Sequence, residues 1–435
     1  MKQSGTFNAV VGYFREVLAS LPDQRTGKNR RYEIKDAALS AFSVFFTQTP
    51  SFLAYQRAMS KTKGRNNAQS LFGVHQIPSD NHIRALLDGV PPQLLYPVFE
   101  FILTLLEQGG QLECFRSFAD TVLIALDGTE YFSSTQIHCP ACSTRKRKDG
   151  TTHYFHQVVT PVVVCPGRSQ VLPLEPEFVV PQDGHDKQDC ENAAAKRWLT
   201  TYGPRYSQWQ ATILGDDLYC HQPMVKQLLS QQFNFILVCC PGSHTSLYDY
   251  LDGMELPTVV TQRWTGKATE TITYRYLNQL PLINEAEAVL VNWCEVVITQ
   301  PDGRVTYKNA FITNVHLTDG NVADVVNAGR TRWKVENENN NTLKTKGYNL
   351  EHNFGHGQQH LAALLATLNI MSLLIHTLLE LLDEKYQLLR AQLPTRKTFF
   401  DDLRALTRYL YFESWEHLLT FMIEGLELDP PPNTS

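Results

Sequence analysis

Several features on which other enzyme classes depend are missing from this 435-residue sequence. It has no glycine-rich loop of the kind that cradles nucleotide phosphates, and no serine in a nucleophile elbow. These absences argue against an ATP-driven protein and against a serine hydrolase. The opening segment, Met1–Thr6, lacks the apolar core of a signal peptide, so we expect a cytoplasmic protein.

An uninterrupted apolar run is also missing. The longest apolar stretch, Leu361 to Leu382, is broken by the polar residues Asn369, Ser372, His376 and Glu380. A helix that crosses a bilayer has about 20 mostly apolar residues and rarely contains ionisable ones. We therefore expect a buried helix here, and no membrane partner.

A positive net charge is the third absence. The chain has 39 Lys and Arg against 44 Asp and Glu, which gives a formal charge of −5. This balance argues against a protein that coats nucleic acid through its net charge, but local basic patches are sufficient for DNA contact. One such patch is Arg145-Lys146-Arg147-Lys148, and its alternative interpretation is a solvated loop.

The length exceeds what one compact core usually holds, so we expect two or three domains. The patterns divide the chain into a helical N-terminal domain (1–115), the first part of an α/β catalytic domain (116–240), a β-rich insertion (241–315), the remainder of the catalytic domain (316–390), and a helical C-terminal region with a tail (391–435). In the first of these, Ser79-Asp80 starts a short helix after a turn. This helix is either the second helix of a helix-turn-helix that contacts DNA or part of ordinary helical packing.

The order of elements in the α/β part indicates a ribonuclease-H-like mixed sheet. Apolar and β-branched runs predict five strands, at 121–126, 155–164, 169–180, 210–215 and 233–240. Helices at 187–198 and 224–231 separate the third, fourth and fifth strands. In this fold the first and fourth strands are neighbours, and further strands predicted within 257–313 would form an inserted β subdomain.

Three acidic residues stand in matching contexts. Asp127 and Asp216 each end an apolar strand, and Glu336 lies on a later helix. Carboxylates that converge at one edge of a sheet are typical ligands of Mg²⁺. Two such ions about 3.5–4 Å apart can activate a water and stabilise a leaving oxygen on phosphorus. The pattern therefore predicts metal-dependent phosphodiester chemistry on DNA.

Neighbouring acids compete for two of these positions. Asp217 is an alternative to Asp216. We prefer Asp216, because Asp216 directly follows the apolar run and stands three positions before an aromatic residue. Glu338 is an alternative to Glu336, which is preferred because it follows Arg332 by four residues, and that step places both side chains on one helix face. Asp127 itself, standing before a glycine, is alternatively a turn residue.

The ordered set of motifs resembles the DDE transposases of bacterial insertion sequences, in the class with a Tyr-Arg-Glu-Lys signature around the third acid. The resemblance covers about residues 20–390. It rests on the two strand-ending aspartates, on the β-rich segment before the third acid, on Arg332-Trp-Lys-Val-Glu336, and on Lys344 after it. Lys344 stands one position later than the signature spacing, and Gly329 stands where the signature has its tyrosine.

The resemblance implies a ribonuclease-H-like catalytic domain that holds two Mg²⁺ or Mn²⁺ ions on Asp127, Asp216 and Glu336. It implies cleavage at transposon ends followed by strand transfer into target DNA. The partners would be the terminal inverted repeats and the target DNA, bound by a homodimer at the nucleoid. A DNA-binding protein that no longer cuts, and a nuclease without strand transfer, remain alternatives.

Three residues near the third acid receive roles in DNA binding from the same resemblance. Arg332 would hold a phosphate near the transposon end through a bidentate contact. Lys344 is the nearest match to the signature lysine. Trp333 either stacks on a base in place of the absent tyrosine or belongs to the core.

A second constellation combines cysteine and histidine. Cys139 and Cys142 form a Cys-x-x-Cys, and His153 and His156 follow as His-x-x-His. Together they offer four ligands to a structural Zn²⁺, and zinc there would present Arg145–Lys148 to DNA. However, His-x-x-His on a strand places the two imidazoles on opposite faces. Three alternatives remain open: a zinc ligand set that uses His138 or Cys190, a reduced cysteine pair that binds no metal, and a redox-active cysteine pair.

Two further groups of residues have alternative interpretations. Asp189 and Glu191 open the helix before the fourth strand, either as first-turn acids favoured by the helix dipole or as extra acids near the metals.

His352, His356 and His360 step by four residues, but Gly355 and Gly357 argue against a continuous helix. We expect these histidines to contact phosphate or backbone near the active site.

Overall fold

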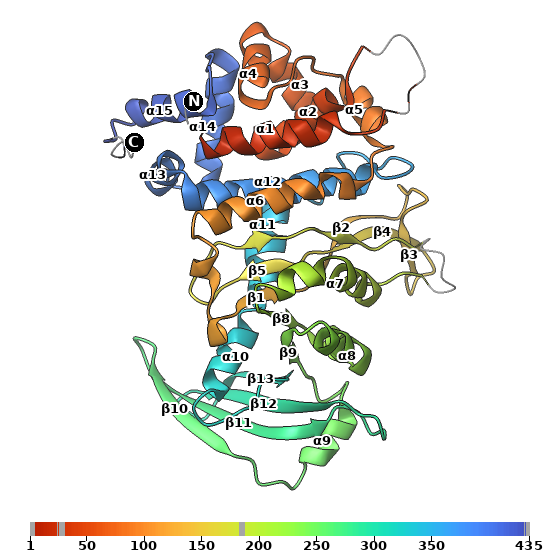
Figure 1. Cartoon of the computed structure of the whole chain (residues 1–435), viewed down its shortest axis with the longest axis vertical. Helices are drawn as coiled ribbons and strands as arrows, with labels where there is room; N and C mark the ends of the chain where they lie inside the picture. Colours follow the sequence, from red (N-terminus) through yellow and green to blue (C-terminus); the bar gives the residue numbers. More distant parts are fainter. Residues whose placement is uncertain (1–4, 24, 26–30, 182–187, 430, 432–435) are drawn as a thin grey trace.

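The computed structural model describes residues 5–23, 25, 31–181, 188–429 and 431. The start of the helix predicted from Lys187 and most of the tail predicted after Asp429 lie outside these ranges. Figure 1 shows helices from both ends of the chain gathered at one side of the molecule, strands across its middle, and a curved set of strands at the opposite side.

The helical layer is built from both ends of the sequence. Its first helices are α1 (Thr6–Ala19), α2 (Ile34–Phe46), α3 (Phe52–Met59), α4 (Thr62–Phe72), α5 (Asp80–Leu87) and α6 (Tyr96–Gln108). Its last are α12 (Leu361–Leu382), α13 (Glu384–Gln392), α14 (Arg396–Tyr409) and α15 (Trp415–Gly425). Helix α14 packs on α4, and α12 packs on α2 and α6. The segments predicted as separate N-terminal and C-terminal regions thus share one core.

Helix α12 is the buried helix that the sequence predicts. It has the length and apolarity of a membrane span, yet 89% of its most apolar window is buried inside the protein. Its polar residues have partners within the core, because Asn369 donates to the carbonyl of Tyr348 at 2.8 Å and Nδ1 of His376 lies 2.6 Å from the Tyr348 hydroxyl. Buried polar groups need such partners, and they identify α12 as a core helix.

The central sheet has the strand order expected of a ribonuclease-H-like fold. Its first strands are β1 (Val122–Ala125), β5 (Val162–Val164), β6 (Leu172–Pro173), β8 (Ala211–Gly215) and β9 (Asn234–Val238). They lie side by side in the order β6-β5-β1-β8-β9, with β1, β8 and β9 parallel. The predicted pairing of the first strand with the fourth is confirmed, since Val122 pairs with Ala211 and Ala125 with Leu214.

Two predicted strands are wrong in extent, and proline is the reason. The segment 155–164 is divided at Pro161 into β4 (Thr152–Val159) and β5, which belong to different sheets. The segment 169–180 forms only β6 and β7 (Glu177–Phe178), with Pro176 between them. A proline has no N–H to donate to a ladder, so pairing stops or changes partner there. Strand β4 instead pairs with β2 (Gly128–Ser134), β3 (Ser143–Lys146) and β7.

The β-rich segment extends the central sheet. Its strands are β10 (Thr258–Trp264), β11 (Thr269–Pro281), β12 (Leu290–Thr299) and β13 (Val305–Thr313). They form an antiparallel meander, and β13 pairs with β9, so nine strands form one continuous sheet. The β-rich segment is therefore an extension of the central sheet, visible at the lower side of Figure 1.

The remaining helices cover the two faces of this sheet. They are α7 (Glu191–Ser207), α8 (Gln222–Ser230), α9 (Thr245–Leu251), α10 (Val322–Arg330) and α11 (Asn341–Thr345). Because side chains alternate along a strand, Val122 and Ile124 of β1 enter the large core shared with α12, while Leu123 and Ala125 enter a second core against α10. A strand buried on both faces reads as a continuous apolar run, which is why β1 is predictable from the sequence.

Candidate active site

The two predicted aspartates lie at the same edge of the central sheet. Asp127 follows β1 and Asp216 follows β8, and these strands are adjacent and parallel. The N–H of Leu126 still donates to the carbonyl of Leu214 at 2.9 Å, so the pairing continues up to Asp127. Asp216 accepts the N–H of Leu218 at 3.0 Å, which fixes its carboxylate at the start of a short turn.

Arg332 connects the third acid to the first. Glu336 lies in a π-helical segment, Val335–Asn340, and its Oε1 is 2.7 Å from Nη2 of Arg332. Nη1 of the same guanidinium is 3.9 Å from Oδ1 of Asp127. Its positive charge also lowers the pKa of Asp216 against the larger effect of burial. The structure therefore brings Asp127 and Glu336 to a single arginine, whose charge also acts on Asp216 at the end of the neighbouring strand.

Asn340 holds Asp127 in place, a role that no sequence pattern indicates. Its Nδ2 donates to Oδ2 of Asp127 at 2.8 Å. Its Oδ1 accepts from Oγ1 of Thr160 and from Nδ2 of Asn339, both at 2.9 Å. Because the acceptor end of the amide is occupied in this way, its donor end is directed at the aspartate. Asn340 ends the same π-helical segment that carries Glu336.

Glu191 is a fourth carboxylate beside the three acids. Its Oε1 accepts from the N–H of Gly128 at 2.9 Å and from the hydroxyl of Tyr219 at 2.7 Å, and its Oε2 accepts from Gln157 at 2.8 Å. A Cβ at position 128 would lie 2.2 Å from Oε2 of Glu191, so a larger residue there would displace this carboxylate. Asp189, by contrast, is buried and paired with Arg197 at 2.8 Å.

The concentration of acids changes how strongly Asp127 holds its proton. Burial is the largest cause, and together with the charges of Glu191 and Glu336 it raises the pKa of Asp127 to about 7, while Arg332 acts in the opposite direction. Burial also raises the pKa of Asp216 and of Glu191. A site whose carboxylates resist ionisation in this way gains stability when a cation is added.

The family assignment follows from comparison of the sequence with family models. The model described as a transposase DDE domain matches residues 125–374, more than half of the chain. The chain belongs to the DDE transposase family. A comparison with curated proteins finds no match. The matched region begins within β1, includes all three acids of this transposase, and ends within α12.

The competing acids have different partners in the transposase. Asp217 accepts the backbone N–H of Cys240 at 2.6 Å and the hydroxyl of Ser243, and it lies 3.4 Å from the imidazole of His244. It therefore fixes the turn after β9. Glu338 lines a separate pocket with Lys346. The geometry thus favours Asp216 and Glu336 as the residues that share Arg332 with Asp127.

The predicted DNA-binding residues lie in different surroundings. Lys344 pairs with Glu351 at 2.9 Å. Trp333 is 45% exposed, with Lys334 over its ring, so the interpretation of Trp333 as a core residue is wrong. The basic patch Arg145–Lys148 is exposed where β3 ends, and Arg145 pairs with Glu130 at 2.6 Å. An exposed tryptophan and an exposed basic turn are both available to a nucleic acid.

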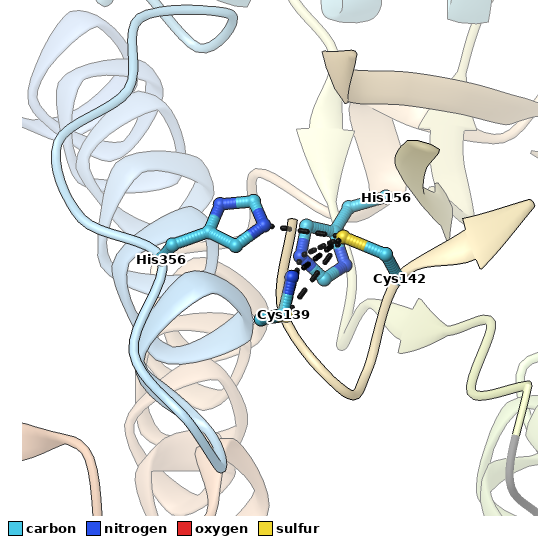
Figure 2. Close-up of side chains that lie close together, drawn as sticks. All are labelled: Cys139, Cys142, His156 and His356. Carbon is cyan, nitrogen blue, oxygen red and sulfur yellow. Dashed lines mark hydrogen bonds between the residues drawn. The ribbon is translucent and has the colours of Figure 1, made fainter. Parts of the chain in front are cut away.

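A cluster of cysteine and histidine side chains lies on the sheet formed by β2, β3 and β4. Figure 2 shows that Cys139, Cys142, His156 and His356 converge. Their ligand atoms all lie within 4.8 Å of one another. We call these four residues the Cys/His cluster. His356 belongs to the segment before α12, more than 200 positions after Cys142, so the expectation that it contacts phosphate or backbone is replaced by a contact with a thiol.

The structure does not bring His153 to this cluster. His153 pairs with Arg145 across β3 and β4, and its ring stacks on Phe155 at 5.8 Å. His156 is three residues further along the same strand and therefore projects from the other face. The ligand set predicted from Cys139, Cys142, His153 and His156 thus needs His356 in place of His153. Likewise, His138 stacks on Tyr154 and is exposed.

We expect Asn340→Ala to lower strand cleavage by the transposase about 10- to 100-fold, the usual effect of removing a partner that orients a metal ligand. The reason is the loss of the donor that fixes Asp127. Cleavage would be compared with that of Asn337→Ala, whose amide contacts only the carbonyl of Trp333 among the described residues. Equal rates for the two variants would remove the positioning role.

Proposed function

We propose that this transposase cuts DNA at the ends of a mobile element and joins the freed 3′ ends to target DNA. Asp127, Asp216 and Glu336 would carry the reaction by holding Mg²⁺ or Mn²⁺. The observation that carries the proposal is that Asp127 and Glu336 meet at Arg332, while Asp216 lies beside Asp127 at the edge where parallel strands β1 and β8 end.

The donor set suits hard divalent cations. Carboxylate oxygens are the ligands that Mg²⁺ and Mn²⁺ prefer. Burial, and after it the charges of Glu191 and Glu336, raise the pKa of Asp127, and a bound cation would offset both effects. When bound, two such ions supply activation of the attacking water and charge stabilisation of the leaving oxygen. The protein's own contribution is to hold Asp127 through Asn340 and to keep Glu336 within reach through Arg332.

One hydrogen-bond donor of Arg332 is not used within the described part of the protein and is offered to the substrate. Its side chain is 19% exposed, and Nη1 is a buried donor with no hydrogen-bond acceptor among the residues that the structure describes. Leaving such a donor unpaired costs about 1–3 kcal/mol. A DNA phosphate would satisfy it, and guanidinium groups bind phosphate oxygens in a bidentate manner. This supports a phosphate-holding role for Arg332.

The helix geometry supports membership of the Tyr-Arg-Glu-Lys class. In this chain Lys344 is eight residues after Glu336, one position beyond the signature spacing. The segment Val335–Asn340 is π-helical, and a π turn takes up one residue more than an α turn. The wider π turn therefore compensates for the additional residue between Glu336 and Lys344. On this geometry Lys344 lies on the side of the helix that the signature requires.

The proposal includes an assembly on DNA. Two transposon ends must be brought together, so we expect a homodimer when the inverted repeats are bound. The exposed turn at Arg145–Lys148, Trp333 and the helical layer around α5 are the surfaces offered for DNA contact. The working location would be the nucleoid in the cytoplasm.

The test is a cleavage and joining assay. A labelled duplex with the inverted repeats that flank the gene is incubated with Mg²⁺, Mn²⁺ or chelator, using the parent chain, Glu336→Gln and Glu338→Gln. We expect metal-dependent nicking at the repeat end and joined products from the parent and from Glu338→Gln, and neither product from Glu336→Gln.

Three alternative outcomes would each contradict part of the proposal. Cleavage without joined target would indicate a nuclease that lacks strand transfer. Specific binding of the repeats without cleavage by any variant would indicate a DNA-binding protein. Cleavage by Glu336→Gln at the rate of the parent and of Glu338→Gln would show that Glu336 is not the third acid.

A further inference from the structure

The Cys/His cluster joins three segments that are far apart in the sequence. Cys139 and Cys142 lie in the connection from β2 to β3, His156 is on β4, and His356 precedes α12. Figure 2 shows the side chains meeting from these three directions. Cys142 and His156 are buried, at 3% and 4% exposure, whereas His356 is partly exposed, so the cluster lies at the edge of the protein interior.

The distances within the cluster match the edges of a tetrahedron around one ion. Bond lengths of about 2.3 Å from zinc to sulfur and about 2.0–2.1 Å to nitrogen give edges of about 3.8 Å between sulfurs and about 3.5 Å between sulfur and nitrogen. The two sulfurs are 3.8 Å apart. Nε2 of His156 is 3.4 and 3.6 Å from them, and Nε2 of His356 is 3.1 Å from the sulfur of Cys142.

Neither a disulfide nor a redox pair accounts for all four side chains of the cluster. A disulfide would need a sulfur–sulfur distance of about 2.0 Å, and both cysteines are free thiols. A redox pair has no need of two imidazoles, yet the rings of His156 and His356 lie 4.7 Å apart with both Nε2 atoms at the sulfurs. Two thiolates with two imidazoles form a ligand set that selects zinc over magnesium or calcium.

We propose that Cys139, Cys142, His156 and His356 bind one Zn²⁺ in a closed tetrahedral site. Four protein ligands leave no position for substrate, which is the mark of a structural ion. Binding releases the two thiol protons to solvent and leaves both imidazoles neutral. This inference goes beyond the proposed function and does not depend on it.

The ion would clamp the sheet of β2, β3 and β4 to the segment that leads into α12. His356 is 20 residues after Glu336, and Asp127 directly precedes β2, so the clamp connects the flanks of two of the three acids. It would also fix β3, whose end carries the basic turn Arg145–Lys148. Because the unfolded chain does not hold these distant ligands together, the free energy of zinc binding would add to the stability of the folded state.

The first experiment measures zinc in the full chain, purified without added metal and without DNA. A second group, Cys220, Cys239 and His244, also has its ligand atoms within 4.8 Å. Total zinc therefore cannot assign the site by itself. We expect Cys142→Ser and His356→Ala to lose about one zinc per chain relative to the parent.

Two matched controls keep the assignment specific. His352→Ala removes an exposed histidine from the same segment as His356, and His244→Ala removes the histidine of the second group. Both should retain the zinc that His356→Ala loses. The proposal would be overturned if Cys142→Ser and His356→Ala contained as much zinc as the parent. It would also be overturned if the parent contained no zinc and bound none after its cysteines were reduced.

A ligand exchange covers the case in which His356→Ala fails to fold. His356→Cys supplies a third thiolate, and we expect it to fold and to bind about one zinc, as sites with three cysteines and one histidine do. With Co²⁺ as the probe, the parent and His356→Cys should show the visible absorption of a tetrahedral thiolate complex, with a changed spectrum in the variant. Identical spectra would rule out His356 as a ligand. Because no readout uses DNA, a catalytically inactive chain can still pass the test.

Discussion

Asp127→Asn is expected to lower strand cleavage by about 10³-fold, the scale of several kcal/mol that metal-ion catalysis contributes. The same substitution is expected to raise the melting temperature of the metal-free protein at pH 8. Asparagine keeps an oxygen that can accept from Asn340 but carries no charge into a site that already contains Glu191 and Glu336. One substitution would thus remove activity and add stability.

The sign of the pH dependence follows from the raised pKa of Asp127. The carboxyl has a pKa of about 7 in the folded chain, against an ordinary value of 3.8. A raised pKa means that the folded state holds the proton more tightly, so its stabilising effect is complete below pH 3.8 and is lost as the pH rises to about 7. Above that, the parent carries a penalty of about 4 kcal/mol that the asparagine variant lacks.

Thermal unfolding in chelator at pH 5 and pH 8 measures this effect. The melting temperature of Asp127→Asn should exceed that of the parent by several degrees at pH 8. The difference between the two melting temperatures should be smaller at pH 5. Mn²⁺ should raise the melting temperature of the parent at pH 8 and have a much smaller effect on the variant. A variant that is less stable than the parent at pH 8 would show that Asp127 is not under electrostatic strain.

Asn67→Ala is expected to lower the free energy of unfolding by about 3–5 kcal/mol, because it leaves several buried backbone groups without partners. Asn67 lies on α4 and is fully buried. Its Nδ2 donates to the carbonyls of Thr407 and Leu410, both at 2.7 Å, and its Oδ1 accepts the N–H of Phe412 at 2.9 Å. One side chain therefore holds the end of α14 and the turn toward α15.

Denaturant unfolding checks this prediction, with the adjacent Asn66→Ala as the matched control. Asn66 is exposed on the same helix, so its loss should change the free energy of unfolding by less than about 0.5 kcal/mol. Proteolysis should also release α14 and α15 more readily from Asn67→Ala than from Asn66→Ala. Equal stability of the two variants would mean that the contacts of Asn67 contribute no net stabilisation.

The acids are predictable from the sequence because their signal is local. An apolar run that ends in an aspartate marks the end of a buried strand, and this rule places Asp127 and Asp216 on neighbouring strands. The step of four residues from Arg332 to Glu336 is also local, and the structure joins these side chains at 2.7 Å. The four strands predicted within 257–313 correspond to β10–β13 for the same reason.

The features that the sequence does not predict depend on packing between distant segments. Asn340 and Asp127 are 213 residues apart, and nothing next to Asn340 marks it as the partner of an acid. The π-helical turn lies in an asparagine-rich stretch of weak helix formers, where propensity favours no regular helix. His356 reaches Cys142 only because the segment before α12 folds back onto the sheet. Periodicity along a chain carries no information of this kind.

The layer built from both ends of the chain has a consequence for synthesis on the ribosome. The ring of Trp415 packs at 4.6 Å from Phe7 and 5.4 Å from Phe46, so the core around α1 and α2 is incomplete until α15 has been translated. Until then the apolar side chains of α1 and α2 that pack on Trp415 lack that partner. A message truncated before the codon for Trp415 would yield a chain with all three acids of the candidate site and an unfinished fold.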